Sequence, residues 1–84
     1  MEICICDDEK KLRRSLRNAV ETELQLCGVS YTIKEFSSGE ELLSALPSSE
    51  PDILFLDIEM DGISGMETAH RLREKCRKTV MYIL

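Results

Sequence analysis

The sequence lacks three features that would each point to a whole class of proteins. No apolar run approaches the roughly 20 residues that a membrane-spanning helix needs, and Met1–Cys6 has the pattern of a strand rather than of a secretion signal. Acidic residues outnumber basic ones by 16 to 11, and the resulting net charge of −5 argues against direct nucleic-acid contact by this chain. We therefore expect a cytoplasmic protein with no membrane partner.

The third missing feature is a metal or redox motif among the four cysteines. Cys4, Cys6, Cys27 and Cys76 include no C-x-x-C pair, and the chain has a single His. Structural zinc sites instead take four closely spaced Cys or His ligands. We expect reduced, mostly buried cysteines that act as small hydrophobic residues.

Strand-like and helix-like segments alternate along the chain, with no hairpin signal, internal repeat or low-complexity segment. The 84 residues suffice for one small domain only. Apolar or β-branched runs predict four strands: Glu2–Cys6, Val29–Phe36, Ile53–Leu56 and Thr79–Leu84. The alternation predicts right-handed crossovers and therefore a parallel α/β sheet.

Three helices are expected between these strands. The first has an apolar stripe that should face a core, formed by Leu12, Leu16, Ala19, Val20, Leu24 and Cys27. Gly28 suits the left-handed end of that helix. Ser38–Glu41 and Ser64–Glu67 have the S-x-x-E form of a capping box, and Pro47 should end the second helix. The third helix should turn these residues inward: Met66, Ala69, Leu72 and Cys76.

Acidic residues follow two of the expected strands. Asp7 and Asp8 come directly after the first strand, and Asp57 follows the third. If these strands are neighbours, the carboxylates converge at the sheet edge where ligands collect, and their repulsion calls for a cation. Mg²⁺ prefers such oxygen ligands, and beside it a carboxylate can attack a phosphoryl group. Mg²⁺ is thus the expected cofactor, and Asp57 is the candidate nucleophile.

Three stretches resemble the CheY-like receiver domains of bacterial response regulators: Ile3–Glu9 (ICICDDE), Phe36–Leu43 (FSSGEELL) and Asp52–Gly65 (DILFLDIEMDGISG). The resemblance spans residues 1–84 and implies a partial receiver domain. Its fold would be a flavodoxin-like doubly wound parallel sheet of strand order 2-1-3-4, without the family's fifth strand and last helices. The DIEM and SSGEELL segments are most similar to receivers with LytTR-type DNA-binding output.

The resemblance also implies roles for individual residues. Asp57 would accept a phosphoryl group from a histidine kinase, Asp8 would bind Mg²⁺ directly, and Asp7 would support the ion partly through water. Asp57 and the backbone carbonyl of Glu59 would complete the protein ligands, while the Glu59 side chain would modulate dephosphorylation. The implied function is two-component signal transduction toward a transcriptional output domain, by a phosphoacceptor rather than an enzyme.

The sequence departs from the family pattern in two ways, and the second supports an alternative function. Asp61 stands where proline is usual, and the family's switch Ser or Thr, site lysine and switch aromatic would lie beyond Leu84. The alternative is an interaction or dimerisation module that is not phosphorylated and forms a homodimer through its exposed fourth-strand edge. Phosphatases of the haloacid-dehalogenase type also place an Asp after an apolar strand, but that class leaves Asp7 and Asp8 unexplained.

The candidate residues also have purely structural explanations. Asp7 and Asp8 can cap the first helix, and Asp57 can form a turn. His70, a lone histidine, is expected to be an ordinary surface residue. Five basic residues would form either a solvated helix face or, from the resemblance, a kinase-docking surface: Lys10, Lys11, Arg13, Arg14 and Arg17.

Overall fold

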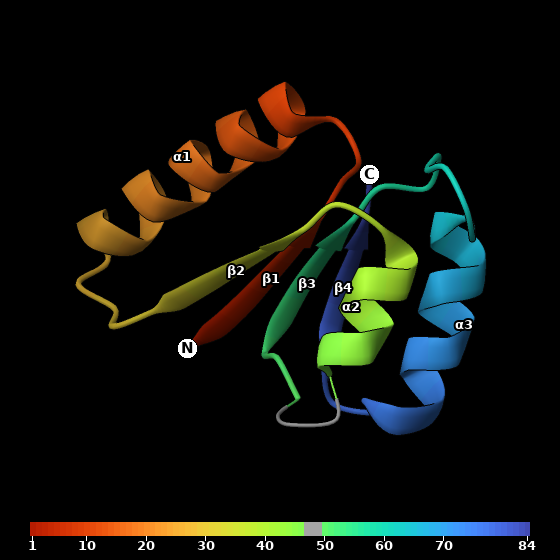
Figure 1. Ribbon diagram of the computed structural model, residues 1–84. Coiled ribbons are helices and arrows are strands. Elements are labelled where there is room, and N and C mark those ends of the chain that lie inside the picture. Colours follow the sequence, from red (N-terminus) through yellow and green to blue (C-terminus); the bar gives the residue numbers. More distant parts are fainter. Residues whose placement is uncertain (47–49) are drawn as a thin grey trace.

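The computed structural model describes residues 1–46 and 50–84, in which strands and helices alternate (Figure 1). The strands are β1 (Glu2–Cys6), β2 (Thr32–Phe36), β3 (Ile53–Leu56) and β4 (Val80–Ile83), and the helices are α1 (Lys10–Leu26), α2 (Gly39–Ala45) and α3 (Gly65–Lys75). The predicted bounds of β1 and β3 are confirmed, whereas β2 and β4 are shorter than predicted. Pro47, expected to end the second helix, lies outside the described residues.

The four strands form one parallel sheet in the order β2-β1-β3-β4. This is the predicted flavodoxin-like, doubly wound arrangement, in which the chain reverses its direction of travel across the sheet between β1 and β3. Cys6 and Leu56, the last residues of β1 and β3, lie opposite each other. The residues that follow them therefore begin at the same edge of the sheet.

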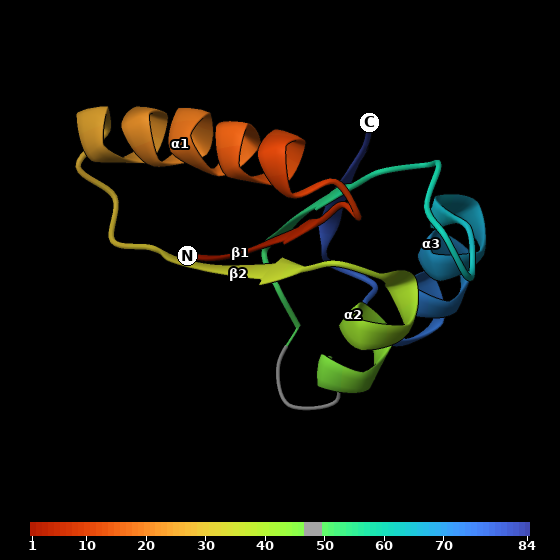
Figure 2. The same ribbon diagram turned by 45° about the horizontal axis from the view of Figure 1, so that its top comes forward.

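Helices α2 and α3 cover one face of the sheet, and α1 lies alone on the other (Figure 2). The main core lies under α2 and α3, and its buried members are Cys4, Cys6, Phe36, Leu42, Leu54, Leu56, Leu72 and Cys76. Both predicted caps are confirmed, since Ser38 Oγ accepts a hydrogen bond from Glu41 N–H (3.0 Å) and Ser64 Oγ accepts one from Glu67 N–H (3.2 Å). These caps fix where α2 and α3 begin.

Helix α1 turns its apolar stripe toward the sheet as predicted, but buries it only in part. None of its residues is buried, and Leu12 remains 56% exposed. A cavity of about 300 Å³ separates the helix from the sheet, with Val20 and Leu24 on one side and Ile53 and Phe55 on the other. Helical periodicity identified the apolar side of α1 correctly, but the sheet below covers it only in part.

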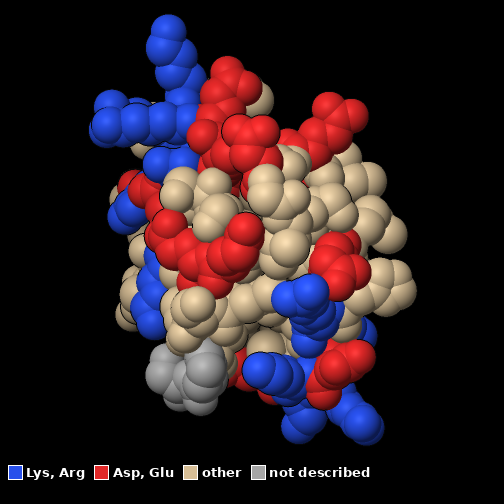
Figure 3. All heavy atoms as spheres, turned by 45° about the vertical axis from the view of Figure 1, so that its right-hand side comes forward, with Lys and Arg blue, Asp and Glu red and all other residues tan. Residues whose placement is uncertain are grey.

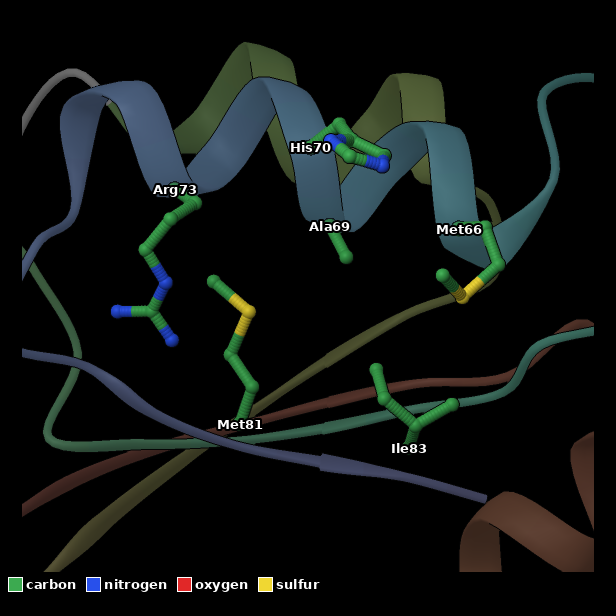
Figure 4. Close-up of a pocket in the computed structure, with 6 residues that line it drawn as sticks. All are labelled: Met66, Ala69, His70, Arg73, Met81 and Ile83. Atoms are coloured by element: carbon green, nitrogen blue, oxygen red, sulfur yellow. The ribbon is translucent and has the colours of Figure 1, made fainter.

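Cys27 and Met66 also correct the sequence-based expectations. Cys27 is exposed at the end of α1, whereas Cys4, Cys6 and Cys76 are buried, and all four are free thiols. Met66 was expected to point inward, but it is 47% exposed. It lines a groove of about 280 Å³ between α3 and β4, together with Met81 and Ile83 (Figure 4).

Gly28 has the expected left-handed conformation, with a φ of 70° directly after the cap of α1. Within residues 1–46 and 50–84, no helix is long and apolar enough to cross a membrane.

Candidate metal centre

The carboxyl ends of β1 and β3 bring three acidic side chains together. Asp7, Asp8 and Asp57 each offer a carboxylate oxygen, and these oxygens all lie within 4.8 Å of one another. Asp7 and Asp57 continue the sheet ladder, because Asp7 N–H donates to Phe36 O (3.1 Å) and Asp57 N–H donates to Cys6 O (3.0 Å). Sheet hydrogen bonds therefore fix the backbone at two corners of this acidic cluster.

Each of the three carboxylates accepts a backbone hydrogen bond from one of the two loops at this edge of the sheet. Glu9 N–H donates to Asp7 Oδ1 (2.9 Å), and Glu59 N–H donates to Asp57 Oδ1 (3.3 Å). Asp61 N–H donates to Asp8 Oδ2 at 3.2 Å, which links the loop after β1 to the loop after β3. Asp8 is thus tied to a distant loop rather than to the start of α1, whose N-cap residue Glu9 makes no side-chain cap.

Burial and charge repulsion both act on Asp7, which is only 4% exposed. The pKa of Asp7 is raised, mainly by burial and also by the negative charges of Asp57 and Asp8. The hydrogen bond from the Glu9 N–H and the positive charge of Arg13 act in the opposite direction and lower it. A cation at the cluster would offset the repulsion between these carboxylates. The chemistry of the site therefore favours a positively charged ligand.

Cys6 lies beneath the cluster and is not part of its ligand set. Burial, followed by the negative charges of Glu41, Asp7 and Asp57, raises the pKa of its thiol to about 12. The protonated Sγ lies 3.4 Å from Ser38 O and 3.7 Å from Met60 Sδ. Cys6 is therefore a buried, protonated core residue next to the carboxylates.

The three carboxylates fit a small divalent ion. Ligands around an octahedral Mg²⁺ with bonds of about 2.1 Å lie roughly 3 to 4 Å apart. The separation of at most 4.8 Å among the oxygens of Asp7, Asp8 and Asp57 is slightly wider. A small movement of one side chain, or a water between it and the ion, closes that difference, so this oxygen-only donor set suits Mg²⁺.

Gly65 allows α3 to begin directly behind Asp57. A Cβ at position 65 would overlap the backbone of Asp57 and Ile58, and Gly65 N–H donates to Ile58 O at 3.0 Å. The loop from Asp57 to Gly65 can therefore close tightly only with glycine at its end. Gly65 ends the Asp52–Gly65 stretch that resembles the receiver family, but this steric need for glycine cannot be read from the sequence.

The hydrogen bond from Arg13 to the backbone of Asp7 was not predicted from the sequence. Its Nη1 donates to the backbone carbonyl of Asp7 at 2.7 Å, and its Nε donates to Glu35 at 3.1 Å. Arg17 also binds Glu35, at 2.6 Å. The basic run is therefore only partly a solvated face: Lys10, Lys11 and Arg14 are exposed, whereas Arg13 and Arg17 turn toward β2.

The remaining candidates lie around the cluster. Glu59 and Asp61 are exposed, and their N–H groups bind Asp57 and Asp8 as described above. His70 is exposed on α3, where it lines the groove beside β4 rather than the acidic cluster. Figure 3 shows acidic side chains gathered over the upper part of one face of the molecule, with basic side chains along its left side and in its lower part.

The sequence of this chain is similar to those of bacterial regulatory proteins. A model of the response regulator receiver domain family matches residues 3–84. The positive alginate biosynthesis regulatory protein of Pseudomonas aeruginosa is 40% identical over 75 residues, which make up 89% of this chain and 29% of that protein. The transcriptional regulatory protein ResD of Bacillus subtilis is 34% identical over 74 residues, 88% of this chain and 28% of that protein. The chain thus spans less than a third of the length of these relatives.

Solved structures share the fold. The response regulator TrrA of Thermotoga maritima, in complex with Mg²⁺-BeF, matches with a TM-score of 0.81 at 35% identity, over 95% of this chain and 64% of that chain. TrrA in complex with the histidine kinase ThkA matches with a TM-score of 0.81 at 34% identity, over 98% of this chain and 66% of that chain. Since the family model extends over all but the first two residues, this chain belongs to the response regulator receiver domain family of two-component systems.

Proposed function

We propose that Asp57 accepts a phosphoryl group from a histidine kinase, with Mg²⁺ held by Asp7, Asp8 and Asp57. The observation that carries this proposal is the convergence of the three carboxylates within 4.8 Å at one edge of the sheet. The TrrA structures support it, because that related regulator is found both with Mg²⁺-BeF and with a histidine kinase. Receiver domains are phosphoacceptors, so we assign no turnover of a separate substrate to this chain.

Each residue of the site has a distinct task in this transfer. Mg²⁺, when bound, offsets the negative charge that the phosphoryl group brings to an acidic site. The Glu59 N–H holds Asp57 Oδ1, so the other Asp57 oxygen forms the bond to phosphorus while the phosphorus–nitrogen bond of the kinase phosphohistidine breaks. We assign the fourth protein ligand to the Glu59 carbonyl and the tuning of dephosphorylation to the Glu59 side chain.

We further propose that residues 1–84 are part of a receiver domain that controls transcription from the cytoplasm. Matching relatives include the transcriptional regulatory protein ResD and the DNA-binding transcriptional regulator NtrC. With a net charge of −5, this chain itself is a poor ligand for nucleic acid. The LytTR-type output suggested by DIEM and SSGEELL stays a prediction, which the output domain of the full-length protein will test.

Intact mass spectrometry tests the phosphoacceptor. We expect acetyl phosphate with Mg²⁺ to add one phosphoryl group to the chain, and we expect EDTA or Asp57→Ala to prevent the addition. Asp61→Asn is the matched control, because Asp61 is a nearby acid whose hydrogen bond to the cluster comes from its backbone N–H and is kept in the variant. An adduct that persists in Asp57→Ala would exclude Asp57 as the acceptor.

A dimerisation module remains the second candidate function, supported by exposed apolar residues on β4 and directly after it. Val80, Tyr82, Ile83 and Leu84 are all exposed, and among the described strands β4 pairs with β3 alone. Such an edge invites pairing with another copy of the chain. Sedimentation analysis should then show a dimer that dissociates in Tyr82→Lys, and a monomer at all concentrations would contradict this candidate.

A further inference from the structure

Arg13 connects the acidic cluster to two other elements of the fold. From α1, its guanidinium donates to the backbone carbonyl of Asp7 at the end of β1 (2.7 Å) and to Glu35 on β2 (3.1 Å). The Arg13 side chain is 15% exposed, so water competes only weakly for these bonds. One side chain thus joins α1, the end of β1, and β2.

The carbonyl that Arg13 binds belongs to the peptide between the two acidic residues. Because a peptide is planar, holding the Asp7 oxygen also fixes the direction in which the chain continues to Asp8. On its other side, Asp7 is held by its N–H bond to Phe36 O (3.1 Å). Both carboxylates therefore extend from a backbone that is already ordered, which reduces the entropy lost on binding an ion.

On the basis of the proposed function, we propose that Arg13 is a positioning residue of the metal site. It holds the Asp7–Asp8 peptide in the geometry that binds the ion and couples this turn to β2 through Glu35. The planar fork of a guanidinium reaches two acceptors at once, whereas the ammonium group of Lys is a single point charge. By linkage, an ion at the cluster then also stabilises the docking of α1 on the sheet.

The positive charge of Arg13 has the opposite effect on a nearby cation, and the two effects must be weighed. Glu35 contacts both Arg13 and Arg17, and Arg17 also contacts Glu21 at 2.9 Å. Two arginines and two glutamates thus form a group with no net charge, which leaves little repulsion toward a cation at the cluster. We therefore expect the ordering of the Asp7–Asp8 peptide to outweigh the charge of Arg13.

Arg17 provides a matched control on the next turn of the same helix. It shares the Glu35 contact with Arg13 but has no hydrogen bond to Asp7 among the described residues. Arg17→Met therefore removes the same positive charge, together with ion pairs to Glu35 and Glu21, and leaves the Asp7 carbonyl held. Arg13→Lys keeps the positive charge but replaces the planar guanidinium, which reaches two acceptors, with a single ammonium group.

Calorimetric titration with Mg²⁺ tests the proposal, since the chain has no Trp to serve as a fluorescent probe. We expect Arg13→Met to raise the Kd for Mg²⁺ roughly tenfold, the lower end of the losses seen for groups that orient metal ligands. Arg17→Met should stay within about twofold of the unaltered chain, and Arg13→Lys should fall between them. In hydrogen exchange, Mg²⁺ should protect the α1 amides in the unaltered chain and in Arg17→Met, but not in Arg13→Met.

Equal or tighter Mg²⁺ binding by folded Arg13→Met would overturn the proposal. If circular dichroism shows that Arg13→Met is unfolded, Arg13→Lys decides, and an unchanged Kd in that variant would contradict the role. If the unaltered chain binds no Mg²⁺, the proposed function fails first and this inference fails with it. Mg²⁺ binding that depends on Asp8 and Asp57 but not on Arg13 overturns the inference alone.

Discussion

The two faces of the sheet are held by different interactions. Under α2 and α3, Leu54, Leu56 and Leu72 are almost completely buried in the main core. On the other face, Ile3 and Ile5 of β1 are buried, but α1 itself has no buried residue, and ion pairs from Arg13 and Arg17 to Glu35 add to its attachment to the sheet. Apolar packing is strong and insensitive to salt, whereas partly exposed ion pairs are weak and screened by salt.

This difference separates stability from the geometry of the site. Leu56 and Cys6 belong to the packed face and directly precede Asp57 and Asp7, so the core fixes the strand ends that carry these acids. Arg13, in contrast, reaches the site from the weakly held face. We therefore expect core substitutions to unfold the chain and α1 substitutions to alter the site in a chain that remains folded.

The largest effect should come from matched Leu truncations on the two faces. Leu72 on α3 is 1% exposed, and Leu72→Ala should lower the free energy of unfolding by about 3 kcal/mol through lost burial and a new cavity. Leu16 on α1 is only partly buried, so Leu16→Ala should cost about 1 kcal/mol or less. Urea denaturation measures both, and equal losses would contradict the contrast between the faces.

Glycine substitutions compare the start of α3, at Gly65, with the end of α1, at Gly28. Gly65→Ala should cost about 2 kcal/mol, because its Cβ meets the backbone of Asp57 and Ile58, which cannot move independently of the site. Gly28→Ala should cost about 1 kcal/mol, since only its φ of 70° is unfavourable and the space around it is open. Only Gly65→Ala should also slow phosphorylation by acetyl phosphate.

The ion pairs on the α1 face should make a smaller contribution that depends on salt. Glu35→Gln should lower the free energy of unfolding by about 1 kcal/mol at low ionic strength, and by less in 1 M NaCl. The loss in Leu72→Ala should not change with salt. Urea denaturation at the two salt concentrations measures this difference, and a salt-independent effect of Glu35→Gln would argue against ion pairs as the attachment of α1.

The smallest effects should appear in the pH dependence of stability, with opposite signs for two acids. Hydrogen bonds from Arg17, opposed by burial and assisted by Arg13, lower the pKa of Glu35. Its contribution is therefore present above the ordinary pKa of Glu and is lost as pH falls through the lower folded value. The pKa of Asp7 is raised, mainly by burial, so its contribution is present below the ordinary pKa of Asp and is lost as pH rises through the folded value.

Acid titration of the free energy of unfolding checks these signs. Glu35→Gln should flatten the loss of stability toward low pH, whereas Asp7→Asn should remove a loss that develops as pH rises. Because Mg²⁺ bound as proposed would offset the charge at Asp7, these measurements require metal-free buffer. The same slope in both variants would contradict the opposite shifts.

Local sequence signals predicted the strands and the acids that follow them, because these depend on short segments such as the apolar run Ile53–Leu56. The convergence of the acids also required β1 and β3 to be neighbours, and this strand order came from the family resemblance. The exposure of α1 could not be predicted in this way, since periodicity shows which side of a helix is apolar and not how much of it is covered. The contact between Arg13 and Glu35 depends on the strand register that places Glu35 opposite Ile5. A run of basic residues in the sequence does not reveal this register.

The unequal environments of the four thiols offer an experimental handle. Cys4 and Cys6 are buried, and burial raises their pKa values to about 11 and about 12; burial also raises the pKa of Cys76. Maleimides react with the thiolate, so in the native protein they should label Cys27, the exposed cysteine at the end of α1, in preference to the other three. A probe attached there, without any substitution, would report movements of the helix that carries Arg13.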